Sequence, residues 1–374
     1  MRHLWYTTLV HSSLRTDNHE LITVMYKPNY IISPSILSAV SEIAQIKTLV
    51  ERSRVLPLNE AQMRRQAIVR MAHTSTSIEG NKLAEFQVKK VLAGEKIAGD
   101  EKSIQEVKNY QVALQKIEEL SVSYTHLTID KILQLHQILM KGLLETKKSG
   151  HFRPASIFVV DDLGNGQEIL RYEGPVASKV PFLINQLLLW VNSSSMIHPI
   201  IKAGIFHLQF VSIHPFTDGN GRMARLLTQY LLYRDGWDFR KIIVLEDYYN
   251  RDRQGYYNAE NMVQGKRYQE GQDITTWLEY FVGGFLVEAQ KVAEAISSIG
   301  FDKIALKGGQ VFLDKDEAII VDFLTTTGRI TSQDVQDILG IAKRTAQLRL
   351  KALVDKGMLV SQGKGPSTYY VLSN

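Results

Sequence analysis

The chain has 374 residues, of which 44% are hydrophobic and 22% charged, and its formal net charge is +5. These values are typical of a soluble globular protein with two or three domains, and the weak positive charge permits nucleic-acid contact without requiring it. The chain contains no cysteine, which excludes disulfides, thiol catalysis and cysteine-bound zinc and fits a reducing cytoplasm.

Residues 1–29 mix polar and apolar side chains. They lack the basic start, apolar centre and small-residue cleavage site of a secretory leader. No stretch of the chain approaches the roughly eighteen consecutive apolar residues of a membrane-spanning helix. We therefore expect neither a leader nor a membrane segment, and we expect a cytoplasmic protein.

The region from residue 30 to about residue 144 is expected to be helical. Apolar residues recur there at spacings of three and four, which is the pattern of one buried helix face. Ser35 is a candidate cap for the first helix, whose apolar positions begin at Ile36. Three further helices are predicted over residues 59–77, 102–121 and 128–144.

The pattern then changes to short apolar runs at residues 157–160 and 168–172. Turn-forming residues 161–166 separate the two runs, which predicts a β-hairpin with a longer loop. Helical spacing returns over residues 180–192, 200–213 and 222–234. The central part of the chain is therefore expected to be all-helical except for one inserted hairpin.

One segment concentrates candidate chemistry and reads, in order, His214, Pro215, Phe216, Thr217, Asp218, Gly219, Asn220, Gly221 and Arg222. Asparagine and two glycines favour a tight turn whose N–H groups face an anion, and the turn feeds a helix N-terminus that favours phosphate. Asp218 offers a hard oxygen ligand for Mg²⁺ shared with a nucleotide. Arg222 and Arg225 can reach the anion from one helical face. The alternative is a turn that merely joins two helices.

This order resembles the Fic family signature H-x-F-x-[D/E]-G-N-G-R-x-x-R at every fixed position. The resemblance implies a mainly α Fic-type helical bundle and a protein adenylyltransferase, which moves AMP from ATP to a Ser, Thr or Tyr hydroxyl of a target or of itself. It also implies that the hairpin Ile157–Tyr172 is a flap on which an extended target segment docks. The alternative is a hairpin that only covers the core edge.

Within this chemistry, His214 is the one residue of the segment able to accept a proton near neutral pH, so we assign it as general base. Asp218 would hold Mg²⁺, and Arg222 and Arg225 would offset the charge of the β- and γ-phosphates. The backbone N–H groups of the loop would cradle the phosphates, and the Asn220 side chain would contact the α-phosphate. The loop residues assigned to ATP are Phe216, which we expect to anchor the loop in the core, Gly219, Asn220, Gly221, Arg222 and Arg225.

The nucleoside needs a second set of contacts. The family places a Tyr pair and, seven residues after it, an Asn against the nucleoside; Tyr256 and Tyr257 match the pair, and Gln264 stands at the later position. A tyrosine ring can stack on adenine and an amide can read its edge. Simple packing is the alternative for these tyrosines. His207 is expected to be a hydrogen-bonded core histidine rather than a second base.

A second resemblance concerns residues 75–80. Ser75, Glu79 and Gly80 match the family's inhibitory motif [S/T]-x-x-x-E-[G/N]. The match implies that Glu79, at a helix end, forms an ion pair with Arg225 and occupies the γ-phosphate site. The alternative is a surface glutamate at a helix that ends at Gly80.

The chain changes character near Lys315. Three short helices, at residues 318–324, 334–339 and 342–355, and a hairpin at residues 357–372 resemble a winged helix-turn-helix. Its third helix and wing carry Lys343, Arg344, Arg349, Lys351 and Lys364. DNA is therefore a candidate partner, and a protein, a second copy of the chain in a homodimer or a solvated face are the alternatives.

These assignments divide the chain into an N-terminal helical region with the inhibitory motif (1–110), a Fic catalytic domain (111–300) and a winged helix-turn-helix domain (301–374). An autoinhibited adenylyltransferase is the leading hypothesis. Alternatives are a Fic-type enzyme that removes AMP with water positioned by Glu79, and a DNA-binding regulator with a vestigial Fic unit. A kinase-type variant is disfavoured, because family members that act as kinases carry Lys where Arg222 stands.

Overall fold

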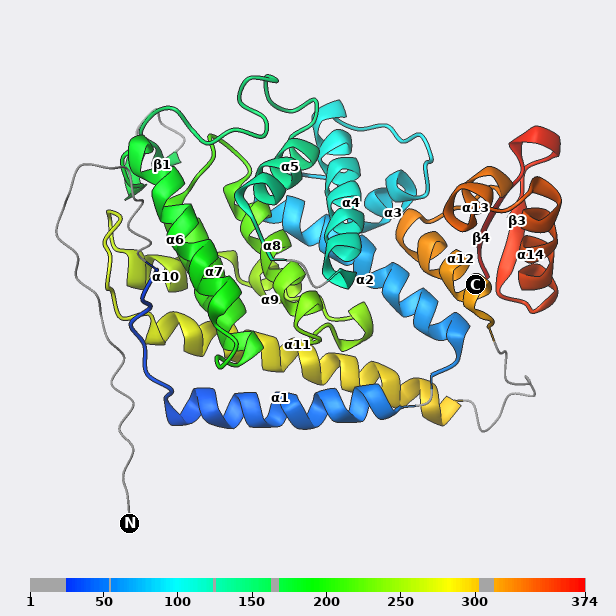
Figure 1. Ribbon diagram of the computed structural model, residues 1–374, viewed down its shortest axis with the longest axis horizontal. Helices are drawn as coiled ribbons and strands as arrows, with labels where there is room; N and C mark the ends of the chain where they lie inside the picture. The colour runs from blue at the N-terminus through cyan, green and yellow to red at the C-terminus, as the bar shows by residue number, and fades with distance from the viewer. Residues whose placement is uncertain (1–24, 54, 124–125, 163–167, 303–312, 374) are drawn as a thin grey trace, which may run out of the picture.

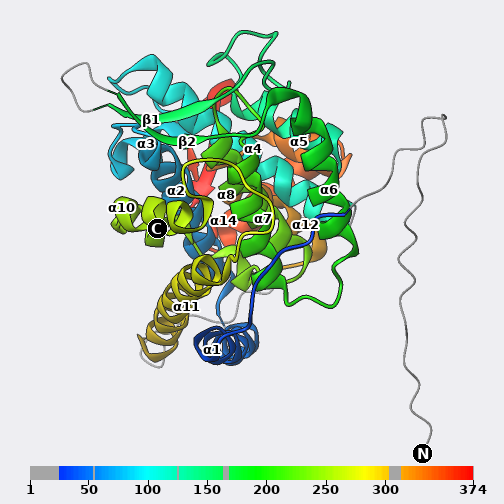
Figure 2. The same cartoon turned by 90° about the vertical axis from the view of Figure 1, so that its left-hand side faces the viewer.

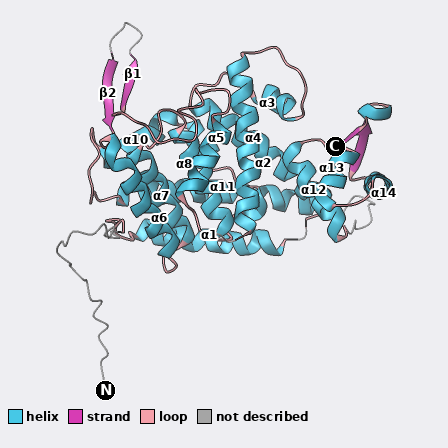
Figure 3. Cartoon of the chain, turned by 45° about the horizontal axis from the view of Figure 1, so that its top comes forward, coloured by secondary structure: helices cyan, strands magenta, loops and turns pink. Residues whose placement is uncertain are grey.

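The computed structural model describes residues 25–53, 55–123, 126–162, 168–302 and 313–373. Within these ranges the protein is mainly helical, as expected from the sequence (Figures 1 and 3). The expectation of no leader falls largely on residues 1–24, which lie outside the described residues, as do residues 163–167 of the hairpin loop. Among the described helices, none combines the length and apolar character that crossing a membrane requires.

The N-terminal half consists of helices. They are α1 (Pro34–Arg52), α2 (Pro57–Ile78), α3 (Glu85–Leu92), α4 (Glu101–Val122) and α5 (Ile129–Leu139). The Ser33 side chain, rather than that of Ser35, caps α1 by accepting a hydrogen bond from the Ile36 N–H, so that expectation was wrong by two residues. The helix predicted to reach residue 144 ends at Leu139, because the chain turns there and Gly142 adopts a left-handed φ of 73°.

The predicted hairpin is present. Strands β1 (Phe158–Asp162) and β2 (Glu168–Glu173) pair antiparallel, with a register shift between Val159 and Val160. The hairpin projects from one end of the helical body (Figure 3). The β2 end of the hairpin is tied to the body where the Glu173 N–H donates to the carbonyl of Lys266.

The remaining helices of the central body surround α7 and α8. They are α6 (Val180–Ser193), α7 (Pro199–Ile213), α8 (Asn220–Arg234), α9 (Glu246–Arg251), α10 (Arg253–Gln264) and α11 (Thr275–Asp302), with short 3₁₀ turns η1 (Ala177–Lys179) and η2 (Phe239–Lys241). α7 and α8 are buried on nearly all sides, and α4 packs on α8. α1 runs along α11 at the foot of the molecule (Figures 1 and 2).

The sequence analysis placed α3 in a helical region without giving it bounds, and it assigned no elements to α9, α10 and α11. The longest omission, α11, contains the pair Gly283 and Gly284, which is typical of a helix interruption. In the structure the helix continues through both glycines. A Cβ on Gly284 would collide with the ring of Tyr248, so glycine is required there for close packing rather than for a turn.

A second, smaller core lies at the C-terminus. It is formed by α12 (Lys315–Thr327), α13 (Ser332–Leu339), α14 (Lys343–Asp355) and the antiparallel pair β3 (Leu359–Gln362) and β4 (Tyr369–Leu372), joined by η3 (Gly365–Ser367). Ala61 of α2 is buried in this core rather than in the main one. The Thr326 carbonyl accepts hydrogen bonds from Arg65 (3.1 Å) and Gln111 (2.7 Å). The C-terminal unit therefore rests on α2, the helix that ends at Glu79.

Candidate active site

The central loop begins where α7 ends. His214 caps this helix in a left-handed conformation (φ 50°, ψ 61°), and its N–H donates to the Phe210 carbonyl (3.1 Å). Such a conformation is uncommon for a residue with a side chain and persists only where surrounding contacts hold it. Here it places the histidine side chain on the wall of a cavity at the N-terminus of α8.

Two side chains fix the loop from inside. Phe216 is fully buried and stacks on His136, with ring centroids 3.7 Å apart and nearly parallel planes. The Asn220 amide accepts from the Phe216 N–H and donates to the Phe216 carbonyl, both at 2.8 Å. Phe216 therefore anchors the loop and does not line the cavity. The expectation that the Asn220 side chain contacts the α-phosphate is corrected, because both ends of its amide are already used.

His136, which the sequence analysis did not single out, also supports the loop. The Gly150 N–H donates to its Nδ1 (2.9 Å), so the ring hydrogen lies on Nε2, which donates to the Asp218 carbonyl (3.0 Å). Burial lowers the pKa of His136 to about 4, which keeps the ring neutral. Its role is to hold the backbone of Asp218 in place.

Arg153 is a second supporting residue that the sequence analysis missed. It is buried, and its guanidinium donates to the carbonyls of His214 (2.8 Å), Ala155 (2.7 Å) and Pro175. Its own N–H donates to the Pro215 carbonyl (2.9 Å). These bonds tie the loop to both ends of the hairpin. A lone arginine outside any motif gives no sequence signal for such a role.

The His214 side chain is oriented for proton transfer. Its Nδ1–H donates to the Val211 carbonyl (3.1 Å), and a carbonyl can only accept, so the lone pair remains on Nε2. Burial lowers the pKa of His214 below its ordinary value. The imidazole is therefore neutral near pH 7, as a general base requires.

His214 faces a cavity of about 460 Å³. The lining residues from the loop and α8 are Thr217, Asp218, Gly219, Asn220, Gly221 and Arg225; those from other elements are Glu79, Val159, Val160, Arg171, Tyr172, Val211, Tyr256, Tyr257, Glu260, Asn261 and Gln264. Gly219 has φ 83°, and a Cβ there would lie 2.8 Å from the Met140 sulfur. A Cβ on Gly221 would collide with the Glu79 carboxylate. Both glycines are thus required by close approach, and Gly219 also by its left-handed backbone conformation.

Arg225 is bound by the end of α2. Its Nη2 lies 2.6 Å from Glu79 Oε1, its Nε donates to Ser75 Oγ (2.9 Å), and Nη2 also donates to the Ser75 carbonyl (2.9 Å). Arg225 is buried, which by itself would lower its pKa, but the charge of Glu79 outweighs burial and raises it. Gly80, at φ 97°, ends the helix directly after Glu79. Ser75 and Glu79 of the predicted inhibitory motif thus contact the arginine that the motif implies, and Gly80 ends the helix beside them.

Arg222 does not join Arg225 in the cavity. Its Nη2 lies 3.1 Å from Asp218 Oδ1, and its Nη1 lies 3.4 Å from Glu106 Oε1 on α4. The expectation that both arginines face one anion is therefore not met in this conformation. Glu106, which holds Arg222 on the side of α4, was missed because it lies in an ordinary helix without a motif.

The predicted Tyr pair is divided between core and cavity. Tyr256 is 1% exposed, its ring stacks on Tyr249 at 4.4 Å, and its hydroxyl bonds to His207 (2.9 Å). Tyr256 is therefore a core residue with one ring face stacked on Tyr249, and its near-complete burial argues against the expected stacking on adenine. Tyr257 is partly exposed to the cavity, and its ring lies under the Arg171 guanidinium (4.9 Å). His207 is a buried, hydrogen-bonded core residue, as expected.

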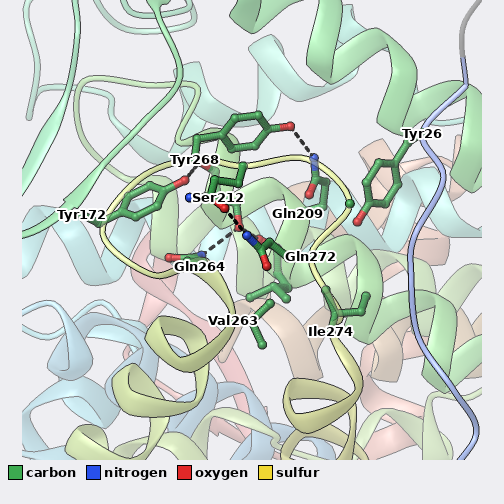
Figure 4. A pocket seen from close by; sticks show the side chains of 12 residues that line it. Tyr26, Tyr172, Gln209, Ser212, Val263, Gln264, Tyr268, Gln272 and Ile274 are labelled. Carbon is green, nitrogen blue, oxygen red and sulfur yellow. Dashed lines mark hydrogen bonds between the residues drawn. The ribbon is translucent and has the colours of Figure 1, made fainter.

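Gln264 lies at the far end of the cavity. It is buried, and its Nε2 donates to Ser212 Oγ (2.9 Å). The Tyr172 hydroxyl donates to the Ser212 carbonyl (2.6 Å), which links the hairpin to the end of α7 (Figure 4). Among the described residues no donor is bonded to the amide oxygen of Gln264, so this oxygen is placed to accept a hydrogen bond from a base edge.

Comparison with known proteins agrees with this site. The Fic/DOC family matches residues 126–232, which include the loop and α8. The protein adenylyltransferase Fic of Drosophila melanogaster is 33% identical over 179 residues, and the match covers 46% of this chain and 34% of the fly protein. The chain therefore spans about a third of the length of the curated relatives it matches.

Solved structures extend the likeness over the whole fold. A Fic family protein from Desulfovibrio desulfuricans G20 superposes with a TM-score of 0.60 at 25% identity, covering 93% of this chain and 99% of that one. Fic-1 from C. elegans superposes with a TM-score of 0.54 at 22% identity, covering 70% and 74% of the two chains. Residues 126–232 therefore match the Fic/DOC family, and the chain shares the helical fold of solved Fic proteins.

Proposed function

We propose that the protein transfers AMP from ATP to a Ser, Thr or Tyr hydroxyl of a protein. The observation that carries the proposal is that a general base and an anion-binding site face the same cavity. The free Nε2 of His214 and the N-terminus of α8 face the same cavity. The Fic/DOC family match over residues 126–232 includes this site, and the fly relative is a named protein adenylyltransferase.

The geometry supports an in-line displacement. His214 Nε2 takes the proton of the target hydroxyl, whose oxygen bonds to the α-phosphorus while the bond from that phosphorus to the β-bridging oxygen breaks. Pyrophosphate leaves with the bond electrons, and the proton on His214 is later lost to water. The N–H groups of Asn220 and Gly221 at the start of α8 stabilise the charge on the phosphate oxygens. The Gly219 N–H already donates to the Asp218 carboxylate.

Mg²⁺ is part of this proposal. The donor set fits it, because the Asp218 carboxylate lies on the cavity wall with its side chain 47% exposed. No cluster of three or more ligating side chains occurs within the described ranges. One carboxylate with waters and phosphate oxygens is the usual Mg²⁺ arrangement at nucleotide sites. When bound, the ion would offset phosphate charge, and Asp218 would hold it.

Autoinhibition by Glu79 is a further part of the proposal. Arg225 is the cationic side chain that lines the phosphate end of the cavity beside the loop, and three hydrogen bonds commit it to the end of α2. The γ-phosphate of ATP would have to displace the Glu79 carboxylate from this arginine. The state described here is therefore proposed to be the restrained one.

The hairpin is proposed to dock the target protein. Phe158, Val160 and Leu170 are exposed by 54%, 40% and 36%, and all three belong to its strands. An extended peptide added to a strand edge gains main-chain hydrogen bonds, while apolar side chains of this kind select its sequence. This arrangement would hold a hydroxyl beside His214.

DNA is proposed as a partner of the C-terminal unit. Lys343, Arg344 and Lys351 on α14 and Lys364 in the hairpin are exposed. Arg349, which was predicted with them, instead pairs with Asp314 and Asp316 and is removed from the candidate surface. A homodimer and a cytoplasmic location stay predictions from the sequence.

Intact-mass spectrometry of the purified chain tests the proposed function. Incubation of the Glu79→Gly protein with ATP and Mg²⁺ should add the mass of one or more AMP groups, and digestion should place them on Ser, Thr or Tyr. Addition of a phosphate mass instead, or no addition to the chain or to a protein extract, would contradict AMP transfer.

A further inference from the structure

Glu260 on α10 is a buried carboxylate on the wall of the active-site cavity. It is 6% exposed, and its Oε1 lacks a hydrogen-bond partner among the described residues. Leaving a buried acceptor unpaired costs on the order of 1–3 kcal/mol, and more when the group is charged. A carboxylate in this position therefore needs a donor that the described residues do not provide.

The nearest side chains do not provide that donor. Thr228 donates its hydroxyl hydrogen to the Ala224 carbonyl (2.7 Å), so it accepts from His207 Nδ1–H (2.9 Å). His207 is therefore unprotonated at Nε2, which accepts the hydroxyl hydrogen of Tyr256 (2.9 Å). Burial lowers the pKa of His207 and so opposes a second ring proton. Oε1 of Glu260 lies 3.7 Å from this Nε2, with no hydrogen between them.

The position of Glu260 along α10 relates it to the nucleotide. Tyr257 marks the phosphate end, because its hydroxyl lies 3.4 Å from the carbonyl of Ile78, next to Glu79. At 1.5 Å per residue, Glu260 lies roughly 4.5 Å further along the helix and Gln264 roughly 10 Å further. A nucleotide whose phosphates lie near Arg225 presents its ribose first and its base second along this path.

We propose that Glu260 is a specificity-determining residue that accepts a hydrogen bond from a donor on the nucleoside. The ribose hydroxyls are the donors that its position favours, and the exocyclic amine of adenine is the other source of the same chemistry. The proposal rests on the proposed function, since it assumes a nucleotide in the cavity. It adds recognition of the ribose hydroxyls, which the loop, His214 and the tyrosines do not provide.

Calorimetric binding to the full-length Glu79→Gly protein tests the proposal. The ligands are ATP, 2′-deoxy-ATP, 3′-deoxy-ATP and purine riboside triphosphate, which lacks the 6-amino group. With Glu260 present, at least one deoxy nucleotide should bind about tenfold or more weakly than ATP, the loss typical of a hydrogen bond to a charged group. Glu260→Met removes both carboxylate oxygens. In this variant the dissociation constants of ATP and of that deoxy nucleotide should agree within about twofold.

Two further variants keep the test decisive. Glu260→Gln retains one acceptor and should give intermediate discrimination, and it replaces the Met variant if that protein does not fold. Glu246→Gln is the matched control, because Glu246 is likewise buried with an unpaired oxygen but does not line the cavity. It should leave discrimination between nucleotides unchanged.

The outcomes separate the two proposals. Discrimination that depends on Glu260 supports the inference, and its appearance with purine riboside triphosphate alone assigns the adenine amine as the donor. A Met variant that keeps the discrimination of the parent, or a parent that binds ATP and every analogue alike, overturns the role of Glu260 while ATP binding and AMP transfer stand. Absence of ATP binding to the parent overturns both.

Discussion

Glu79 Oε1 lies 2.6 Å from Arg225 Nη2, so this contact joins the C-cap residue of α2 to the second arginine of α8. The contact spans 146 positions of sequence. The arginine is buried while the Glu79 side chain is 32% exposed. A ligand can therefore reach the Glu79 carboxylate without unfolding the site around Arg225. This access makes the ion pair suited to regulating ATP binding.

Replacing Glu79 should release this control. Glu79→Gly leaves Arg225 free for the γ-phosphate, and we expect self-labelling with AMP to rise by on the order of tenfold or more, since each 1.4 kcal/mol is a factor of ten. The gain should vanish in the Glu79→Gly, Arg225→Ala double variant. Glu60→Gly is the matched control, because it removes an ion pair to Arg240 from the other end of the same helix. Equal labelling of wild type and Glu79→Gly would contradict autoinhibition.

Loss of the base should separate chemistry from binding. In His214→Ala the loop backbone, held by Arg153 and Asn220, stays in place, so ATP should bind with little change while transfer falls below detection. Isothermal titration and labelling measure the two effects. Labelling at the wild-type rate would show that another group accepts the proton.

The pH dependence of transfer follows from the same histidine. The pKa of His214 lies below its ordinary value of 6.5 because the ring is buried. Transfer should therefore change little between pH 8 and pH 7, and it should fall to half of its maximum only below pH 6.5, as the base becomes protonated. An initial-rate profile of the Glu79→Gly protein that already halves near pH 7 would be inconsistent with a buried neutral base.

His136 predicts a loss of stability in acid. Its pKa is lowered to about 4 in the folded protein, against 6.5 when unfolded, so protons bind the unfolded state more tightly between these values. Its contribution is fully present above pH 6.5 and is lost as the pH falls toward 4. Between pH 7 and pH 5 it should amount to about 2 kcal/mol of unfolding free energy.

Denaturant titrations of wild type and His136→Gln at the two pH values measure this contribution. The Gln variant should lose less stability in acid than wild type by roughly that amount, because its amide does not titrate. An identical pH dependence of the two proteins would mean that His136 is not held neutral by burial.

The C-terminal unit should support α2 without completing the site. The residues that line the cavity all lie between positions 79 and 264, so deletion of residues 315–374 should leave self-labelling largely intact. Removal should expose the Ala61 face of α2 and lower the Tm. A folded truncation without activity would show that this unit completes the catalytic machinery.

Much of the site could be predicted because its chemistry is local in sequence. The run from His214 to Arg225 fixes a turn, a helix N-terminus and a base by residue type and spacing alone. Ser75, Glu79 and Gly80 are separate from it in sequence, and only the resemblance to a family related them to Arg225. The hairpin could be predicted because the helical spacing of apolar residues gives way to short apolar runs near residue 157.

The remainder depends on tertiary packing that no local pattern contains. Tyr256 looks like a stacking residue in sequence, but His207 and Tyr249 take its hydroxyl and its ring. Arg222 has the spacing to reach the phosphates, but Glu106, more than a hundred positions away, holds it elsewhere. α11 was missed because a Gly pair suggests a break unless the ring that packs on it is known.

The most direct test of the central claim compares two isotopic forms of ATP on three proteins. Wild type, Glu79→Gly and His214→Ala are incubated with ATP labelled at the α- or the γ-phosphate, and protein-bound label is counted. We predict label from the α position alone, strongest on Glu79→Gly and absent on His214→Ala. Label from the γ position, or equal α-label on all three proteins, would contradict an AMP-transferring enzyme restrained by Glu79.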